Sequence, residues 1–256
     1  MAHDKLALVT GASSGIGRCL AQIAASDGHD LLLVSQTSEI EHPEALEMTG
    51  AQVETLHADL SDEEGIDKLM TALGGRCPDL LFANAGHGRV GHFADQDEVD
   101  LVHLVGTNVL GTTVLVHRIL RRMLGRGHGR ILLTGSVAGR MPGPNQAVYN
   151  ASKAYVNMLA RALHHEVMGT GVSVTNLAPG PVDTPFFPRS GMDKTLMGQG
   201  PKDDPMTVAG AGYRAMMKGK AEVVSGWKGK AMQAGSHLMT DGMTAELHRV
   251  MARPRQ

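Results

Sequence analysis

The sequence predicts an α/β fold in which one doubly wound parallel sheet carries helices on both faces. Short apolar runs that are typical of buried strands alternate along the chain with longer segments of helical periodicity. Parallel strands need crossover connections, and helices supply these crossovers on either face of the sheet. A chain of 256 residues is also long enough to bury one large core.

The individual strands and helices follow from these patterns. Residues 5–10 form an apolar run that stops at Gly11, and a helical stripe with Leu20, Ile23 and Ala24 follows. The sequence predicts further strands over residues 31–34, 52–57, 80–83, 130–134, 172–177 and, weakly, 222–225. Long helices are expected over residues 97–124 and 149–168.

We expect a single domain over residues 1–256, with its core at about 4–225. Residues 181–205 are rich in proline and glycine and lack periodicity, which indicates a long substrate loop or a loop with a short helix. The C-terminal extension, residues 226–256, looks helical in parts, with a break expected at Gly242. From Lys218 onward there are seven basic and three acidic residues, with apolar residues such as Trp227 among them. The extension could contact a membrane surface or a neighbouring subunit, but covering its own domain is favoured.

Composition limits the class of protein. A net charge of −2 gives no overall attraction to nucleic acid or to a membrane, and aromatic residues at 3% leave an aliphatic, Met-rich core. Cys19 and Cys77 lack the spacing of a zinc site or a disulfide framework, so we expect both to be buried and expect no metal site. The first strand begins almost at once and no apolar run approaches a membrane span, which predicts a cytoplasmic protein.

A glycine-rich turn lies between the first strand and the first helix. Thr10 to Gly17 read TGASSGIG, and backbone N–H groups at such a helix start can hold a pyrophosphate. The GxxxGxG spacing departs from the GxGxxG dinucleotide fingerprint, so the position after the first strand is what favours phosphate binding over a simple turn. Turn motifs also follow three later strands, where a ligand across the sheet edge would meet them: Asp59-Leu60, Asn84-Ala85-Gly86 and Pro179-Gly180.

Four polar residues are candidates for catalysis. Tyr149 and Lys153 are four residues apart and therefore share one helix face. A nearby ammonium is expected to lower the pKa of the phenol, which is ordinarily near 10. Ser136, just after a predicted strand, could bind a substrate oxygen beside the tyrosine. Asn108 is a poor helix former inside a helical region and could bind water.

The ordered motifs resemble those of the short-chain dehydrogenase/reductase family over roughly residues 4–225. The motifs that carry the resemblance are TGASSGIG at 10–17, NAG at 84–86, YNASK at 149–153 and PGPVDT at 179–184. The resemblance implies a Rossmann-type fold, hydride transfer between a nicotinamide and a carbonyl or alcohol, and a homo-oligomer, either a dimer or a tetramer. It also implies a tetrad of Asn108, Ser136, Tyr149 and Lys153, with Tyr149 as general acid/base, Ser136 orienting the carbonyl, Lys153 tuning the tyrosine and Asn108 holding a relay water. Motifs and resemblance together place at the cofactor Gly11, Ser13, Ser14, Gly15, Ile16, Gly17, Ser35, Gln36, Asp59, Leu60, Asn84, Ala85, Gly86, Tyr149, Lys153, Pro179, Gly180, Val182 and Thr184.

The choice between NADP and NAD depends on the residues after the second strand, Ser35-Gln36-Thr37. An acidic residue there would bind the free ribose 2′-hydroxyl of NAD, and none is present. Neither Gln36 nor Ser14 is basic, although hydroxyl and amide groups can hydrogen-bond a phosphate. The sequence therefore favours NADP(H) with weak discrimination, and NAD stays an alternative.

The substrate is expected to be an apolar carbonyl or alcohol. Residues that support this expectation are Met141, Phe186, Phe187, Met192, Leu196 and Met197, although they could equally fill the core. His87, after the Asn-Ala-Gly turn, is not expected to be catalytic. Two other functions remain open: a non-catalytic dinucleotide-binding regulator, and an enzyme that catalyses epimerisation or dehydration on the same fold.

Overall fold

The computed structural model describes residues 5–36, 40, 46, 49–226, 229 and 240–253. Within these residues the strands form one parallel sheet in the order β3-β2-β1-β4-β5-β6-β7, as the sequence predicts. Their bounds are Leu6–Thr10 (β1), Asp30–Ser35 (β2), Val53–His57 (β3), Leu80–Ala83 (β4), Gly129–Thr134 (β5), Val172–Pro179 (β6) and Glu222–Ser225 (β7). The strand order reverses between β1 and β4, which opens a crevice at their carboxyl ends.

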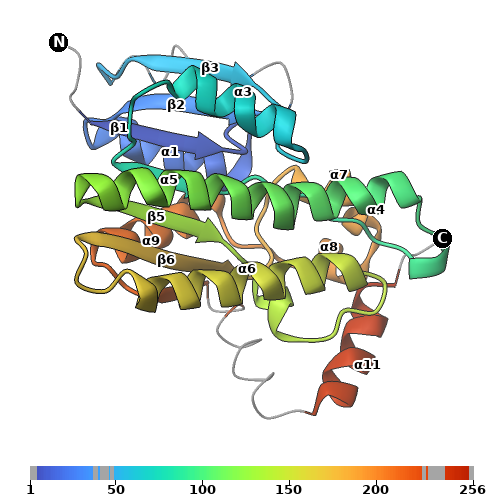
Figure 1. Cartoon of the computed structure of the whole chain (residues 1–256). Helices are drawn as coiled ribbons and strands as arrows, with labels where there is room; N and C mark the ends of the chain where they lie inside the picture. The colour runs from blue at the N-terminus through green and yellow to red at the C-terminus, as the bar shows by residue number, and fades with distance from the viewer. Residues whose placement is uncertain are drawn as a thin grey trace.

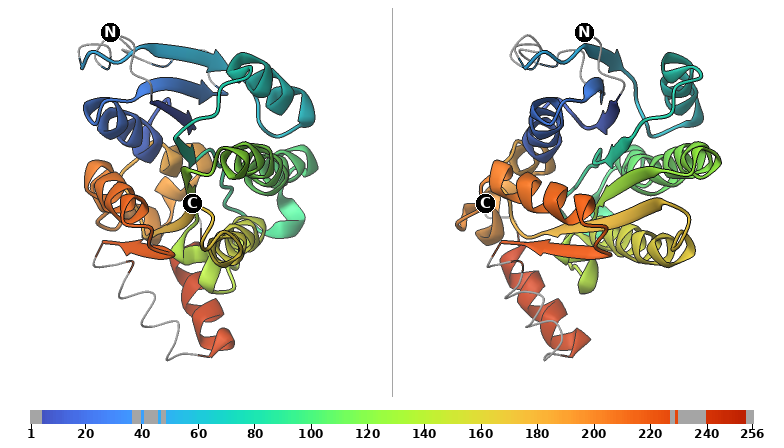
Figure 2. Two further views of the ribbon diagram at one scale, coloured as in Figure 1. Left: turned by 60° about the vertical axis from the view of Figure 1, so that its left-hand side comes forward. Right: turned by 90° about the vertical axis from the view of Figure 1, so that its left-hand side faces the viewer.

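Helices cover both faces of the sheet, as the end-on view in Figure 2 shows. On one face lie α1 (Gly15–Ser26) and α9 (Pro205–Met217), and on the other lie α3 (Glu63–Leu73), α5 (Thr112–Arg126) and α6 (Ala147–Glu166). Each face has its own aliphatic core, because the strands bury side chains on both sides. The expectation of an aliphatic core with few aromatic residues is met, but the expectation of a Met-rich core is wrong, because Leu, Ala and Val supply most of the buried apolar side chains.

The expected helix over residues 97–124 is interrupted in its middle. It consists of α4 (Glu98–Val105), a π-helical stretch (Gly106–Gly111) and α5, which run on continuously (Figure 1). A Cβ at Gly106 or Gly111 would lie 2.4 Å or 1.9 Å from a backbone oxygen of the segment after β3, so glycines let the two backbones approach. Among the described residues, Glu98–Arg126 is long and apolar enough to span a membrane, with a mean hydropathy of 1.5. Its buried side chains pack against the sheet, as in a core helix of a globular domain.

The segment after β6 is more ordered than a simple loop. It contains α7 (Phe186–Ser190), a 3₁₀ turn (Met192–Lys194) and α8 (Leu196–Gln199), and an isolated bridge joins Val182 to Asp203. Of the C-terminal extension, the structure describes α11 (Asp241–Met251). The break expected at Gly242 is wrong, because this residue lies in the first turn of α11, where a glycine costs little. Trp227 lies outside the described residues.

Both cysteines are free and half-buried, so the expectation of full burial is wrong. Burial raises the pKa of the Cys19 and Cys77 thiols, with smaller effects from nearby charges. The thiol, which is the less reactive form, is therefore favoured at neutral pH.

Candidate functional site

A cavity of about 320 Å³ opens at the carboxyl edge of the sheet, in the crevice where the strand order reverses. It brings together nearly all of the residues that the sequence assigns to cofactor or catalysis, from the glycine turn at one end to Thr184 at the other. Two of the assigned residues, Gly17 and Asn108, do not line the cavity. Residues that sequence reasoning missed also line it, among them Thr107, Thr134 and Gln146.

The glycine turn has the shape of a phosphate cradle. Gly11 and Gly15 adopt φ angles of +65° and +56°, which favour glycine, and a Cβ at Gly17 would lie 2.2 Å from the Gly11 carbonyl oxygen. Ser14 precedes α1 without a side-chain cap, and the first turn of α1 holds no acidic residue. The N–H groups at this helix start are thus available to an anion, which fits a dinucleotide pyrophosphate.

The strand ends around this turn are joined by polar side chains. The Thr10 hydroxyl accepts hydrogen bonds from the backbone N–H groups of Asn84 and Ala85, at 3.0 Å and 3.1 Å. The Asn84 amide in turn donates to backbone oxygens of the glycine turn and accepts from the Thr134 hydroxyl at 3.1 Å. These bonds tie β1, β4 and β5 together where a ligand would lie.

At the far end of the crevice lies the group of residues expected to meet the adenosine. Gln36 donates to the Asp59 carboxylate at 2.9 Å, and His103 lies 3.1 Å from the same carboxylate. Although burial raises the pKa of Asp59, hydrogen bonds from Ser61 and His103 outweigh it and leave this pKa lowered. The His57 ring lies 2.6 Å from the Gln36 carbonyl oxygen. This imidazole was not among the residues expected at the cofactor, although it lies beside those expected to distinguish NADP from NAD.

The side chain of Asn108, in the π-helical stretch, makes three hydrogen bonds. Its amide accepts from the His87 backbone N–H at 2.8 Å and donates to the His87 carbonyl and to the Ser152 hydroxyl, both at 2.9 Å. The Ser152 hydroxyl donates to the Tyr149 carbonyl at 2.7 Å. Asn108 therefore connects the turn after β4 with the helix that carries Tyr149, and it is 1% exposed.

Tyr149, Lys153 and Ser136 meet at the middle of the cavity wall. Burial raises the pKa of Tyr149 to about 12, against a smaller lowering by a hydrogen bond with Ser136. Burial also lowers the pKa of Lys153 to about 8, and its ammonium donates to the Thr134 carbonyl at 2.8 Å. The expected lowering of the phenol pKa by the lysine is not found, because desolvation dominates both groups. At neutral pH Tyr149 is a phenol and Lys153 an ammonium.

The substrate end of the cavity is mostly apolar, although Arg189 and His87 also line the cavity. Of the residues expected there, Phe186, Phe187, Met192 and Met197 line it, whereas Met141 and Leu196 do not. The Tyr149 and Phe186 rings lie 5.4 Å apart, and a Cβ at Gly88 would overlap the Phe186 ring. These side chains exclude water from the phenol, which is the origin of its raised pKa.

His248 on α11 also lines this end of the cavity, and sequence reasoning missed it. Its Nδ1 lies 3.1 Å from the Pro144 carbonyl oxygen, which makes Nδ1 the protonated nitrogen in the neutral ring. Among the residues that the structure describes, its buried Nε2 has no hydrogen-bond partner, and burial lowers the pKa of the ring. The described part of the C-terminal extension thus packs on its own domain, the arrangement that the sequence favours.

Fold and site together define a class: a doubly wound protein with a dinucleotide cradle and a Ser-Tyr-Lys constellation beside an apolar cavity. The family model described as short chain dehydrogenase matches residues 5–194. A sulfoacetaldehyde reductase of Chromohalobacter salexigens is 36% identical over 194 residues, 73% of this chain and 76% of that protein. The chain belongs to the short-chain dehydrogenase family.

Two solved structures extend the comparison. A short-chain dehydrogenase from Sphingobium yanoikuyae in complex with NADPH has a TM-score of 0.80 at 27% identity, covering 91% of this chain and 94% of that one. A 3-ketoacyl-(acyl-carrier-protein) reductase from Brucella melitensis complexed with NADH has a TM-score of 0.74 at 26% identity, covering 88% and 98%. The protein is therefore an oxidoreductase that acts on CH–OH groups of small molecules with NAD or NADP.

Proposed function

We propose that the protein is an NADP(H)-dependent reductase of apolar ketones or aldehydes, with Tyr149 as the general acid. The observation that carries this proposal is a protonated, buried Tyr149 hydroxyl hydrogen-bonded to Ser136 in the wall of an apolar cavity. With a pKa of about 12, the Tyr149 hydroxyl is protonated at neutral pH and can act as the acid in the reduction of a carbonyl.

Each residue of the tetrad has a role that follows from its surroundings. The reduced nicotinamide, when bound, supplies the hydride to the carbonyl carbon. Ser136 donates a hydrogen bond to the carbonyl oxygen and orients it, and Tyr149 transfers its proton to that oxygen as the alcohol forms. The Lys153 ammonium stabilises the negative charge left on Tyr149 and binds the nicotinamide ribose. Asn108 keeps the turn after β4 and the Tyr149 helix in fixed relation.

The preference for NADP(H) is supported by the charges around the ribose site. No acidic residue follows β2 at positions 35–37, and a free NAD ribose would therefore lack its usual carboxylate partner. The His57 ring lies beside the Gln36 backbone, near the place where a 2′-phosphate would lie. The Asp59 carboxylate opposes a phosphate from nearby, so discrimination is expected to be modest.

The substrate is proposed to be apolar. Phe186, Phe187, Met192 and Met197 give the cavity its apolar surface.

A panel assay tests the proposed reaction. Purified protein is incubated with NADPH or NADH and a set of aldehydes, apolar ketones and hydroxyketones while the absorbance of the reduced nicotinamide is followed. Oxidation of NADPH that depends on an apolar ketone, with a higher kcat/KM than for NADH, supports the proposal. Tight cofactor binding without turnover would instead indicate a dinucleotide-binding regulator, and product formation without net cofactor oxidation would indicate epimerisation or dehydration.

We also propose that the chain is one domain that pairs with a second copy. Apolar side chains lie exposed on the outer surfaces of α4 and α6 and on the π-helical stretch between α4 and α5, which Figure 1 shows side by side. They include Val99, Val102, Leu110 and Met158, which are 51% to 76% exposed. Burial of such a row against its own copy removes this surface from water, in keeping with the homo-oligomer that the family resemblance implies.

A further inference from the structure

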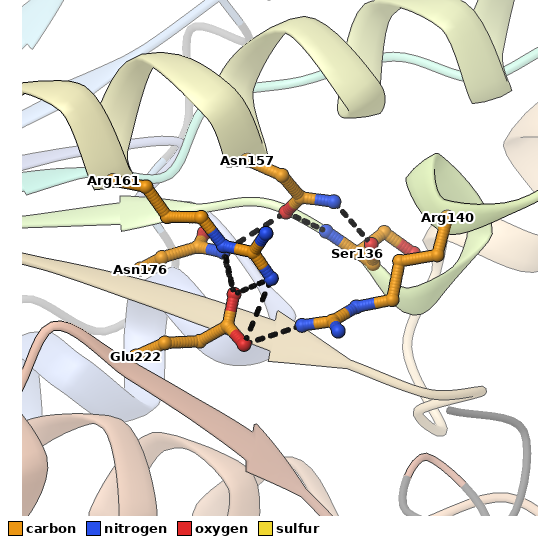
Figure 3. A network of polar contacts seen from close by, with 6 residues as sticks. All are labelled: Ser136, Arg140, Asn157, Arg161, Asn176 and Glu222. Carbon is orange, nitrogen blue, oxygen red and sulfur yellow. Dashed lines mark hydrogen bonds and ion pairs between the residues drawn. The ribbon is translucent and has the colours of Figure 1, made fainter. Parts of the chain in front are cut away.

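A partly buried glutamate outside the cavity binds three side chains from three elements. Glu222 opens the edge strand β7, and its side chain is 18% exposed. Its carboxylate accepts hydrogen bonds from Arg140 after β5, from Arg161 on α6 at 3.1 Å and from Asn176 on β6 at 2.8 Å (Figure 3). Burial raises the pKa of Glu222, but the bonds from Asn176 and Arg140 outweigh it, so the group is a carboxylate at neutral pH.

Two buried amides lead from this carboxylate to the backbone of Ser136. Asn176 donates from the same Nδ2 to Glu222 and, at 3.1 Å, to the Asn157 Oδ1. Asn157 then donates to the Ser136 carbonyl at 2.8 Å and accepts from the Ser136 N–H at 3.3 Å (Figure 3). Ser136 is thus held through both of its backbone groups by one side chain.

The carboxylate determines which way the Asn176 amide points. A carboxylate can only accept hydrogen bonds, so Asn176 must present its NH₂ group to Glu222. The second hydrogen of that group then meets the oxygen of Asn157, whose own orientation is fixed by the backbone groups of Ser136. Without the charge on Glu222, the Asn176 amide could reverse, and its bond to the Asn157 oxygen would be lost.

A direct contact fixes the other end of the same turn. Ser136 begins a 3₁₀ turn, Val137–Arg140, and Arg140 at its end pairs with Glu222. The turn lies flush on its neighbours, because a Cβ at Gly135 would be 2.0 Å from the Asn157 Oδ1 and one at Gly139 2.4 Å from the Ala154 nitrogen. Glu222 therefore holds the serine turn at its first and last residues.

We propose that Glu222 is a positioning residue for the reaction, which holds the Ser136 hydroxyl at Tyr149 and the carbonyl through Asn176, Asn157 and Arg140. This inference rests on the proposed roles of Ser136 and Tyr149. If Glu222 only tied β7 to α6, its ion pairs with the two arginines would suffice. The two amides add a chain of hydrogen bonds that ends at the backbone of Ser136. Losing the carboxylate should disturb the serine and spare the cofactor cradle, which is built on β1 and β4.

The test compares Glu222→Gln with Glu166→Gln, a control at the exposed end of α6. Glu222→Gln keeps the side-chain shape but permits amide reversal. We expect kcat to fall by about 10- to 100-fold, the effect of displacing a reacting group by about 1 Å, while the Kd for NADPH stays unchanged. In alcohol oxidation, the acid limb of the pH profile should move to higher pH, because the Ser136 hydrogen bond that lowers the Tyr149 pKa is weakened. Asn157→Ala removes both bonds to the Ser136 backbone and should lower kcat at least as far as Glu222→Gln, and the two losses should not add in the double variant.

A second measurement is independent of turnover. Hydrogen exchange of the peptide covering residues 134–141 should be faster in Glu222→Gln than in the control, with the glycine turn unchanged. Equal exchange, or equal kcat and pH profile in the two variants, overturns the proposal. If Tyr149→Phe turns over like the unchanged protein, the proposed function fails, whereas an inactive Tyr149→Phe beside a fully active Glu222→Gln rejects only the role of Glu222.

Discussion

The charge on Lys153 predicts how carbonyl reduction depends on pH. Burial lowers the pKa of this ammonium from 10.5 to about 8, which corresponds to about 3 kcal/mol against the charged form. The protonated form supports the reaction, so activity is present below the folded pKa and is lost as pH rises through it. We expect kcat/KM for reduction to be level up to about pH 8 and then to fall by about tenfold per pH unit.

The assay measures kcat/KM with NADPH and the best carbonyl of the panel across the alkaline range. Lys153→Arg supplies the comparison, because a guanidinium stays charged at every accessible pH. Its activity is expected to be lower, since the longer side chain does not fit the same space, but the fall above about pH 8 should disappear. Level activity of the unchanged protein up to the ordinary lysine range near 10.5, or the same alkaline fall in Lys153→Arg, would refute the reasoning.

Three further substitutions test the cradle, the π-helical stretch and the exposed helix face. Gly17→Ala places a Cβ 2.2 Å from a backbone oxygen of the turn, so the Kd for NADPH should rise by more than about tenfold. The control is Gly125→Ala, where the added Cβ meets open space and the Kd should not change. The fluorescence of the bound reduced cofactor measures both Kd values. Asn108→Ala leaves two backbone groups of a neighbouring turn unpartnered, and denaturant unfolding should show a loss of about 2 kcal/mol. Val102→Glu should reduce the mass found by light scattering, whereas an oligomer of unchanged mass would contradict pairing through α4.

Local sequence patterns predict much of the fold. All of the predicted strands form within one or two residues of their expected bounds, because a strand buried on both faces appears as a short apolar run. The ordered turn motifs likewise predicted the cavity residues, since the carboxyl ends of parallel strands share one edge. The break predicted at Gly242 was wrong because a glycine is tolerated in the first turn of a helix.

What sequence reasoning missed depends on contacts between distant segments. In the π-helical stretch, Gly106 and Gly111 pack on the segment after β3, and no local pattern indicates that approach. His248 comes from the C-terminal extension and carries no motif that distinguishes it from other histidines. The raised pKa of Tyr149 arises from burial, whereas helical spacing indicated only the nearby lysine.

Single-turnover oxidation of NADPH by Tyr149→Phe tests the central claim most directly. Phenylalanine keeps the ring against Phe186 and removes the proton donor, so the cavity and the cofactor site are preserved. We predict that NADPH binds with unchanged Kd and that the rate of its oxidation by the panel carbonyl falls by about 10²- to 10⁴-fold, the usual contribution of a positioned acid. A rate equal to that of the unchanged protein would contradict Tyr149 as the proton donor.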